Sequence, residues 1–427
     1  MLIEFRVENH RSLKTEQVLT MEAGRVDGDA TIPRTVPGYS KPLLPVAALY
    51  GANASGKSNV LSALAFMRRA VVDSLFNWAA DDHVPRDPFA WGDAHEQPSL
   101  YEATILQDGV RYQYGFVVSD QCVEEEWLFA WPKAKKQVWF RRQGQKFTFG
   151  EELRLSGARR WIEKVTKANA LFLAVGNTFG HQQLKTVYGW FNQLQTVGIE
   201  DFTREAPGQL LILDELRRNE IHGNAGHTSQ TETDDSQLMD DFRNLLFHAD
   251  IGIVDIKLDR VVSESELKGR SERLRFLLKH QGESEDTWLT LDRESRGTRV
   301  LFHRGPLVIR TLRQGGVVIV DELESSLHPN LALKIVQQFN DPIQNPKHAQ
   351  LIFTTHDTNL LGNTLGPAAL RRDQVWLTEK DRTGGTVLYP LTDFKPRKLE
   401  NLERGYLQGR YGAVPFLGTL SLSGIGG

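Results

Sequence analysis

Apolar and polar residues alternate strictly in two parts of the N-terminal third of the chain. Ile3, Phe5 and Val7 alternate with polar residues, and a second apolar stretch covers residues 18–21. Residues 101–118 alternate on both sides of an Asp-Gly pair, which favours a tight hairpin turn. Because a period of two is typical of strands that bury one face, these patterns predict two strands near a sheet edge and a β-hairpin. Further short strands are expected at 122–129, 137–142 and 147–149.

Longer apolar runs and helical spacing follow. Residues 45–50 form a short apolar run that enters a glycine-rich loop, after which four apolar residues recur at helical spacing between Val60 and Val71. This order predicts a strand, a loop and a helix. Residues 158–250 have a mainly helical pattern, and strand-like runs return at 251–258 and 274–278. The chain is therefore predicted to be an α/β protein in which a helical segment is inserted.

Composition narrows the class of protein. The chain has 427 residues, 40% of them hydrophobic, which is enough for one large domain or two ordinary ones. Its 51 Lys and Arg nearly balance 54 Asp and Glu, so any nucleic-acid contact must come from a local patch. The single cysteine, Cys122, excludes an internal disulfide and a zinc site built on several thiolates. No apolar run is long enough to span a membrane, so we expect a cytoplasmic protein without a membrane partner.

A phosphate-binding pattern follows the first long apolar run. Residues 51–58, GANASGKS, match G-x-x-x-x-G-K-[ST] between a predicted strand and a predicted helix. Glycines let backbone N–H groups surround phosphate oxygens, while Lys57 would reach the β and γ phosphates and Ser58 would bind Mg²⁺. A plain glycine turn before a helix is the alternative. The residues expected to bind nucleotide are Gly51, Asn53, Ser55, Gly56, Lys57, Ser58 and Asn59.

Two carboxylates end a second apolar run. Residues 317–322, VVIVDE, have the continuous apolar pattern of a buried parallel strand. Beside a P-loop, Asp321 would hold the Mg²⁺ shell, and Glu322 would orient and deprotonate the attacking water. Any strand followed by a polar turn would look similar if it stood alone.

Two weaker motifs surround this strand. Residues 351–357, LIFTTHD, predict another strand, after which His356 could sense the γ phosphate and position the water. A lone histidine after a strand is more often structural, but the spacing leaves room for one helix and the next parallel strand. Residues 295–298, SRGT, lie upstream of the carboxylate strand, and by composition alone they predict a turn that caps a helix.

The order of these motifs resembles the ABC ATPase head shared by SMC proteins, RecF and the bacterial OLD-type ATPases. The resemblance implies an ABC/SMC-type P-loop fold that binds ATP with Mg²⁺, hydrolyses ATP, and forms a homodimer or a higher homo-oligomer. It also implies that the signature motif of one head closes over the γ phosphate held by the P-loop of the other. The signature residues are Ser295, Gly297 and Thr298, and the D-loop residues at the same interface are Glu324, Ser325 and Ser326.

This resemblance implies a division of the chain into four parts. Residues 1–157 would form the N-terminal part of the ATPase head, with the P-loop and an antiparallel β subdomain. Residues 158–250 would be a helical insertion, and residues 251–400 would complete the head. Residues 401–427 would be a tail.

Within that superfamily, the chain is most similar to the stand-alone AAA-family ATPases of phage-defence and restriction-linked operons, of the RloA, PtuA and PARIS AriA kind. The segments FRVENHRSL, ESRGT, DELESSLHP and GYLQGRYGAVPFLG carry this likeness. It implies an ATP-driven switch or sensor that controls a separate effector, such as a nuclease of the TOPRIM type. The alternative is a DNA-repair clamp of the RecF kind, for which dimerisation on DNA is itself the function. A transporter motor, a GTPase or a kinase explains the motifs less well.

Some features depart from the family pattern. Pro306 is expected to break the helix that follows the signature. No glutamine can be assigned to the Q-loop, for which Gln97, Gln107 and Gln113 are the candidates. Arg11, in the opening motif, is a candidate contact to nucleotide or to a neighbouring head, with a plain surface arginine as the alternative.

A nuclease site is not expected in this chain. A TOPRIM nuclease needs a D-x-D pair, and the only one, Asp27-Gly28-Asp29, lies in the N-terminal loop. The residues after His356 contain no D-x-D. The effector is therefore expected to be a separate protein.

Two further segments have alternative interpretations. Residues 133–146 mix six Lys and Arg side chains with Trp139 and Phe140, which suits contact with a nucleic-acid backbone such as DNA, or simply the solvated face of a hairpin. The cations are Lys133, Lys135, Lys136, Arg141, Arg142 and Lys146. The aromatic and glycine-rich segment from Tyr406 to Phe416 is expected either to dock the effector or to pack against its own head.

Overall fold

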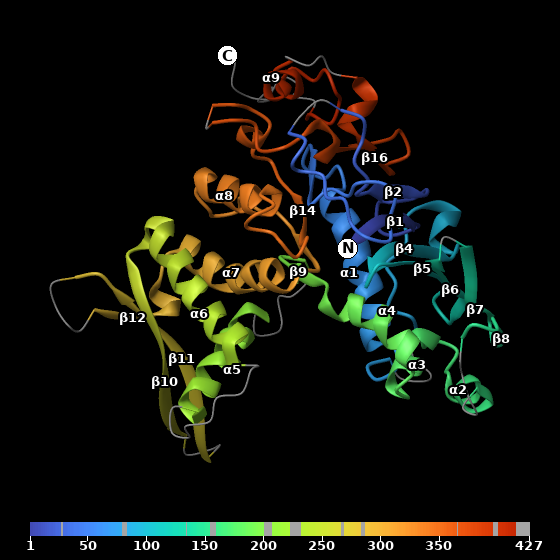
Figure 1. Ribbon diagram of the computed structural model, residues 1–427, viewed down its shortest axis with the longest axis horizontal. Coiled ribbons are helices and arrows are strands. Elements are labelled where there is room, and N and C mark those ends of the chain that lie inside the picture. The colour runs from blue at the N-terminus through green and yellow to red at the C-terminus, as the bar shows by residue number, and fades with distance from the viewer. Residues whose placement is uncertain are drawn as a thin grey trace, which may run out of the picture. The chain divides into compact units, whose positions relative to one another are not determined.

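The computed structural model describes residues 1–26, 29–78, 83–133, 135–153, 159–199, 207–222, 232–265, 269–282, 287–364, 366–395 and 400–415. The chain divides into two compact units, and most of its helices and strands are labelled in Figure 1. Unit 1 contains Met1–Leu194 and Ile352–Gly427, and unit 2 contains Gln195–Leu351.

Unit 1 contains a seven-stranded antiparallel sheet in the order β2-β1-β4-β5-β6-β7-β8. Its strands are β1 (Leu2–Glu8), β2 (Gln17–Thr20), β4 (Ser99–Gln107), β5 (Val110–Val118), β6 (Val123–Lys133), β7 (Lys135–Gln143) and β8 (Lys146–Phe149). The hairpin between β4 and β5 turns at Asp108 and Gly109, whose φ values of 51° and 73° are those that a tight hairpin requires. Both strands predicted near a sheet edge and the predicted hairpin are confirmed.

Helices cover one face of this sheet. They are α1 (Lys57–Asp73), α3 (Phe172–Thr178) and α4 (Gln182–Gln193), and α2 (Arg159–Val165) packs against α3. Buried aromatic rings join strands to helices, because alternate strand residues point toward the same side. The ring centroids lie 4.8 Å apart for Tyr101 and Phe66, 5.6 Å for Tyr114 and Phe191, and 4.8 Å for Phe140 and Phe172.

A group of buried strands in unit 1 leads into the P-loop. β3 (Val46–Gly51) runs parallel to β15 (Val375–Lys380), and β15 pairs with β16 (Thr386–Pro390) in the antiparallel sense. β14 (Gln350–Thr354) ends in unit 1, where the N–H of Thr355 donates to the carbonyl of Leu49 at 3.1 Å. β3 and β14 are buried along their whole length, as expected for continuous apolar runs. α9 (Leu402–Leu407) follows near the end of the described residues.

Unit 2 combines parallel strands, an antiparallel sheet and helices. β9 (Gln195–Val197) and β13 (Val317–Val320) are parallel, and β10 (Ile253–Ser265), β11 (Gly269–His280) and β12 (Trp288–Thr290) form the antiparallel sheet. The helices are α5 (Pro207–His222), α6 (Glu232–Leu246), α7 (Arg296–Gln314) and α8 (Pro329–Asn340). In the core, the ring centroid of Phe302 lies 5.4 Å from that of Phe242 and 5.0 Å from that of Phe276.

The predicted α/β fold with an antiparallel β part is confirmed, but the expected break at Pro306 was wrong. α7 continues through Pro306 to Gln314, and both Gly305 and Pro306 are buried. Because α7 packs against α5 and α6, tertiary contacts offset the one backbone hydrogen bond that proline removes. The domain boundaries predicted at 157, 250 and 400 remain predictions. Within the described ranges, no helix is long and apolar enough to cross a membrane.

Candidate functional site

The P-loop connects β3 to α1 in unit 1. Its backbone turns at Gly51 and Gly56, with φ values of 158° and 103°. Gly56 is required for two reasons, since its φ favours glycine and a Cβ at this position would overlap Oγ1 of Thr386. At Gly51, a Cβ would overlap the hydroxyls of Thr378 and Ser55. The conformation of the loop therefore depends on glycine at both ends.

The start of α1 is suited to an anion. Gly56 is the N-cap, no side chain caps the helix, and no acidic residue lies in its first turn. The N–H groups of the first turn and the positive end of the helix dipole therefore face the loop. Lys57 is only 6% exposed, and its Nζ donates to the carbonyls of Gly51 at 2.9 Å and Ala52 at 3.0 Å. An ammonium group and a helix N-terminus thus meet at one loop, and this combination fits a phosphate.

Hydroxyl side chains from distant parts of unit 1 hold the P-loop. Oγ of Ser55 lies 2.6 Å from Oγ1 of Thr378, and Oγ1 of Thr386 donates to the carbonyl of Ser55 at 2.7 Å. Oγ of Ser12 lies 2.7 Å from Oγ1 of Thr386 and accepts from Nδ2 of Asn59 at 2.6 Å. Asn59, which the sequence predicts to bind nucleotide, is thus a contact of Ser12. Sequence reasoning missed Ser12, Thr378 and Thr386, although Ser12 lies in the opening motif.

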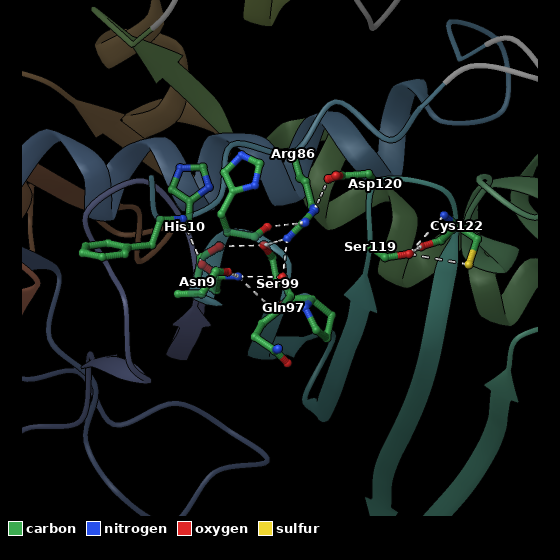
Figure 2. Close-up of polar contacts among 12 residues, drawn as sticks. Asn9, His10, Arg86, Gln97, Ser99, Ser119, Asp120 and Cys122 are labelled. Carbon is green, nitrogen blue, oxygen red and sulfur yellow. Dashed lines mark hydrogen bonds and ion pairs between the residues drawn. The ribbon is translucent and has the colours of Figure 1, made fainter. Parts of the chain in front are cut away.

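The segment that carries Ser12 is anchored by Asn9 (Figure 2). The amide Nδ2 of Asn9 donates to the carbonyls of Ala94 and Gln97, both at 2.7 Å, and Oδ1 accepts from the N–H of Phe89 at 2.9 Å. The carbonyl of Asn9 accepts from Oγ of Ser99 at 2.6 Å. Gln97, one of the Q-loop candidates, contributes its backbone carbonyl here. This network fixes the turn that leads to Ser12.

His10 is a second anchor. Its Nδ1 lies 2.9 Å from the hydroxyl of Tyr101, and its Nε2 lies 3.1 Å from Oγ of Ser62 on α1. Burial, assisted by the positive charge of neighbouring arginines, lowers the pKa of His10 to about 3, so the ring is neutral at physiological pH. Nε of Arg11 forms an ion pair with Oδ2 of Asp87 at 2.7 Å, so a carboxylate of unit 1 already contacts its guanidinium.

His356 lies on the chain segment next to the P-loop strand. It follows β14 directly and its side chain is exposed. The hydroxyl of Tyr50, the residue before Gly51, donates to the carbonyl of Asp357 at 3.0 Å. The hydroxyl of Thr355 accepts from the N–H of Asp357 at 2.9 Å, which fixes the turn around the histidine. The structure therefore brings His356 and the P-loop to neighbouring strand ends in unit 1.

Asp321 and Glu322 follow β13 in unit 2. The N–H of Asp321 donates to the carbonyl of Val197 on β9 at 2.9 Å. Glu322 has a φ of 50°, which is uncommon for a residue with a side chain, and its side chain is exposed. Such a backbone conformation persists only where the surroundings hold it, and it is frequent at functional sites.

Arg304 of α7 supplies such a restraint and was missed by sequence reasoning. Its Nη1 donates to the carbonyl of Glu322 at 2.9 Å. Burial lowers the pKa of Arg304, whereas the negative charges of Asp321, Glu322 and Glu324 raise it. An arginine in the middle of the helix that begins at the signature thus contacts the backbone of the proposed catalytic carboxylate.

The signature motif caps α7. Oγ of Ser295 accepts from the N–H of Thr298 at 3.1 Å and lies 2.8 Å from Oγ1 of Thr298. A Cβ on Gly297 would lie 2.7 Å from the carbonyl of Ser326, so the signature turn and the D-loop are neighbours within unit 2. Locally, then, residues 295–298 form the helix cap that composition alone predicts, with a glycine that the D-loop requires.

The candidate residues are distributed over both units. The P-loop and His356 belong to unit 1, whereas Asp321, Glu322, the signature and the D-loop belong to unit 2. Among the residues that the structure describes, no group of three or more His, Cys, Asp or Glu side chains could hold a metal ion by itself. Mg²⁺ at nucleotide sites usually takes one or two protein ligands together with phosphate oxygens, and Ser58 and Asp321 are oxygen donors of the type it prefers.

Comparison with known proteins gives a family and two structural likenesses. No curated protein matches the chain. The SMC head domain from Thermotoga maritima has 12% sequence identity and a TM-score of 0.38, and the match covers 91% of this chain and 98% of that one. The Smc head domain with an extended coiled coil bound to the C-terminal domain of ScpA, derived from Pyrococcus furiosus, has 12% identity and a TM-score of 0.37, with 96% and 99% covered.

A protein family described as "AAA domain, putative AbiEii toxin, Type IV TA system" matches residues 46–152 and 198–362. These segments make up more than half of the chain and include the P-loop, the signature, the Asp321-Glu322 pair and His356. The chain therefore belongs to this family of AAA-domain proteins.

Proposed function

We propose that this protein is an ATP-binding and ATP-hydrolysing ABC-type ATPase that dimerises to control a separate effector. The observation that carries the proposal is the P-loop. An uncapped helix N-terminus, two glycines that have no room for a Cβ, and a buried lysine amine meet at one loop. Membership of an AAA-domain family supports ATP as the nucleotide.

Each candidate residue has a proposed role in hydrolysis. The backbone amides of residues 51–58 and the amine of Lys57 would bind the phosphates, while Ser58 and Asp321 would hold Mg²⁺, which neutralises phosphate charge when bound. Glu322 would accept a proton from the attacking water, and the exposed His356 would orient that water toward the γ phosphate.

The proposed dimer places the signature of one copy at the nucleotide of the other. Ser295 begins a helix of 19 residues whose first turn has no acidic side chain, so its positive end suits a second contact to phosphate. Ser295, Gly297 and Thr298 would therefore cap the γ phosphate held by the partner's P-loop, with Glu324, Ser325 and Ser326 beside them. In such a dimer each nucleotide site needs residues from both copies.

Mixing two inactive variants tests this arrangement. Glu322→Gln and Ser295→Arg are each expected to abolish ATP hydrolysis when pure. In randomly mixed dimers half are heterodimers, and each heterodimer keeps one site with both residues intact, so about one quarter of the wild-type rate should return. Steady-state phosphate release measures the recovered ATPase rate of the mixture. Size-exclusion chromatography confirms that the variants form dimers.

An inactive mixture of the two variants would contradict sites shared between copies, provided that both variants bind ATP and dimerise. A mixture of Glu322→Gln with Lys57→Ala is the matched control. Both residues act on the same nucleotide in the same copy, so each heterodimer lacks an intact site and this mixture should stay inactive. Recovery in this control would show that restored activity does not depend on a signature supplied by the other copy.

The regulatory part of the proposal concerns a separate effector, in the setting of antiphage defence. The family description includes a putative toxin of a Type IV toxin–antitoxin system, a class of genes that encode paired proteins. We propose a nuclease, of the TOPRIM type, as that partner. The alternative is a clamp of the RecF or SMC kind, for which ATP-dependent dimerisation on DNA is the whole function. Tight ATP-dependent DNA binding by the purified chain without a co-purifying protein would favour the clamp.

The C-terminal tail is the proposed docking element, but part of it also packs against the rest of unit 1. Tyr406 and Tyr411 are buried, and the rings of Tyr406 and Tyr50 have centroids 5.6 Å apart. Truncation after Pro415 spares these contacts. We expect this variant to keep its ATPase rate and its melting temperature but to lose capture of the effector in a pull-down from the native operon. Unchanged capture would remove a docking role for residues 416–427.

A further inference from the structure

The outer face of the antiparallel sheet of unit 1 carries a row of aromatic side chains. Trp127, Phe129 and Trp131 alternate along β6 and therefore point to the same side. This side is opposite to the one on which Leu128 and Ala130 join the core. The neighbours of the row come from β5 and β7, because Arg111 pairs with Trp131 and Arg141 pairs with Trp127 in the strand register.

Three cationic side chains lie over these rings. The guanidinium of Arg111 is 3.9 Å from the ring centroid of Trp131. Nζ of Lys136 is 3.6 Å from the centroid of Phe129 and 5.6 Å from that of Trp131, and the guanidinium of Arg141 is 5.1 Å from that of Phe129. Each distance is within the range of a cation–π contact. The three charges therefore share two rings on one face of the sheet.

Two of these cations face Lys136, and one carboxylate opposes their effect. The pKa of Lys136 is lowered by partial burial first, then by the charge of Arg141 and, more weakly, of Arg111, while Glu102 opposes the shift. Glu102 already accepts from Nε1 of Trp127 at 2.8 Å. No carboxylate forms an ion pair with Arg111, Lys136 or Arg141 among the residues that the structure describes. An anionic ligand would relieve this repulsion.

The strand register decides which residues of the 133–146 segment are exposed and can contact a ligand. Trp139 and Phe140 are buried, and Arg142 is buried beside Glu126 at 3.5 Å. The aromatic partners of the exposed cations are instead Phe129 and Trp131 on the neighbouring strand, of which Phe129 is buried at 7% exposure and Trp131 is half-buried. This face of the hairpin thus has both charge and aromatic rings: β7 contributes the cations and β6 contributes the rings.

We propose that this face binds a single-stranded nucleic acid. Cations along a sheet can track a phosphate backbone, and half-buried rings such as Trp131 offer surfaces on which unpaired bases stack. A duplex buries its bases, so it could use only the charges of this face. A protein partner with acidic side chains would use the charges and not the stacking surfaces. The proposal is independent of ATP hydrolysis.

Binding of fluorescent oligo(dT), oligo(U) and a blunt DNA duplex, followed by anisotropy at low salt, tests the proposal. The full-length protein should bind one or both single strands more tightly than the duplex, and the two oligonucleotides distinguish DNA from RNA. Lys136→Glu combined with Arg141→Glu should weaken binding by about tenfold or more and reduce the salt dependence, because two phosphate contacts are lost. Trp131→Ala should also weaken binding about tenfold, whereas Trp131→Phe should retain most of it.

A matched control exists in unit 2, where Lys257 and Lys279 lie 4.0 Å and 5.9 Å from the ring centroid of Trp288. Lys257→Glu combined with Lys279→Glu makes the same change in total charge and should leave binding unaltered. Equal losses in both double variants, a preference for duplex, or absence of oligonucleotide binding by the wild type would overturn the proposal. Lys57→Ala should bind oligonucleotides normally, so failure of the ATPase proposal is recognised separately.

Discussion

Replacing Lys57 with alanine is expected to weaken ATP binding by about 100-fold or more. The amine of Lys57 is buried at the P-loop, where it donates two hydrogen bonds to backbone carbonyls. With nucleotide bound, the same amine would donate to phosphate oxygens. Two charge-assisted hydrogen bonds contribute about 1.5–3 kcal/mol each. Their sum is roughly 3 kcal/mol or more, which corresponds to about 100-fold in affinity.

Isothermal titration calorimetry with a non-hydrolysable ATP analogue measures this loss. Lys41→Ala is the matched control, since it removes the same charge from an exposed lysine of unit 1 that pairs with Glu22. The control should bind the analogue like the wild type, and both variants should keep their melting temperature without nucleotide. If Lys57→Ala bound ATP as tightly as the wild type, the P-loop could not be the nucleotide site.

The second large effect is expected at a buried ion pair that supports unit 1. Replacing Arg142 with methionine should lower the free energy of unfolding by about 3–5 kcal/mol, because it leaves a buried carboxylate without its charge partner. Nη1 of Arg142 lies 3.5 Å from Oε2 of Glu126, and both side chains are 0% exposed. Arg142 also donates to the carbonyls of Gly144, Lys167, Ala168 and Ala170.

Hydrogen bonds to Glu126 stabilise the buried pair. Its carboxylate accepts from the N–H groups of Phe172 at 2.7 Å and Leu173 at 3.0 Å, at the start of α3, and from the hydroxyl of Tyr114 at 3.0 Å. The pair therefore joins β6 and β7 to α3, which in turn contacts α1. Loss of the arginine should therefore weaken the packing of α3 against α1, the helix that follows the P-loop.

The cost of Arg142→Met should depend on pH. Burial raises the pKa of Glu126 above its ordinary value of 4.5, and the charge of Arg142 opposes this shift. Without the arginine the folded pKa rises further, so the folded variant binds a proton more readily than the unfolded chain. Its stability should then fall as the pH rises from about 4.5 toward the raised pKa, and the loss relative to wild type should be larger at neutral pH than in acid.

Chemical denaturation of the wild type and of Arg142→Met, at neutral and at acid pH, measures the two losses of stability. Arg141→Met is the matched control, because it removes the same charge one residue earlier from an exposed position. Its effect on stability should stay within roughly 0.5 kcal/mol. Equal destabilisation by the two variants, or the same loss at acid and neutral pH, would contradict the role of the buried pair.

Local patterns in the sequence were enough to predict much of the fold. The alternation at Ile3, Phe5 and Val7 predicted β1, and the Asp-Gly pair predicted the turn between β4 and β5. The strand, glycine loop and helix around Lys57 were also predicted correctly. These features depend on neighbouring residues only, since strand periodicity and the φ of a turn are properties of a short segment.

Tertiary packing overruled two local predictions. Pro306 lies inside α7 because contacts with other helices of unit 2 stabilise the helix on both sides of it. Arg142 points into the core whereas Arg141 points outward, although both belong to one basic segment. A change of one position along a strand exchanges its two faces, so the register with neighbouring strands decides which cation is exposed.

By itself, the sequence determined the P-loop, the Asp321-Glu322 pair and the order of the motifs, because each is a short run with its own local signature. Only the tertiary structure decided that Ser12, Thr378 and Thr386 hold the P-loop and that Arg304 contacts Glu322. Ser12 and Thr386 are 374 positions apart. A hydrogen bond between them leaves no periodic trace in the chain, since it arises only when the folded strands bring the two hydroxyl groups together.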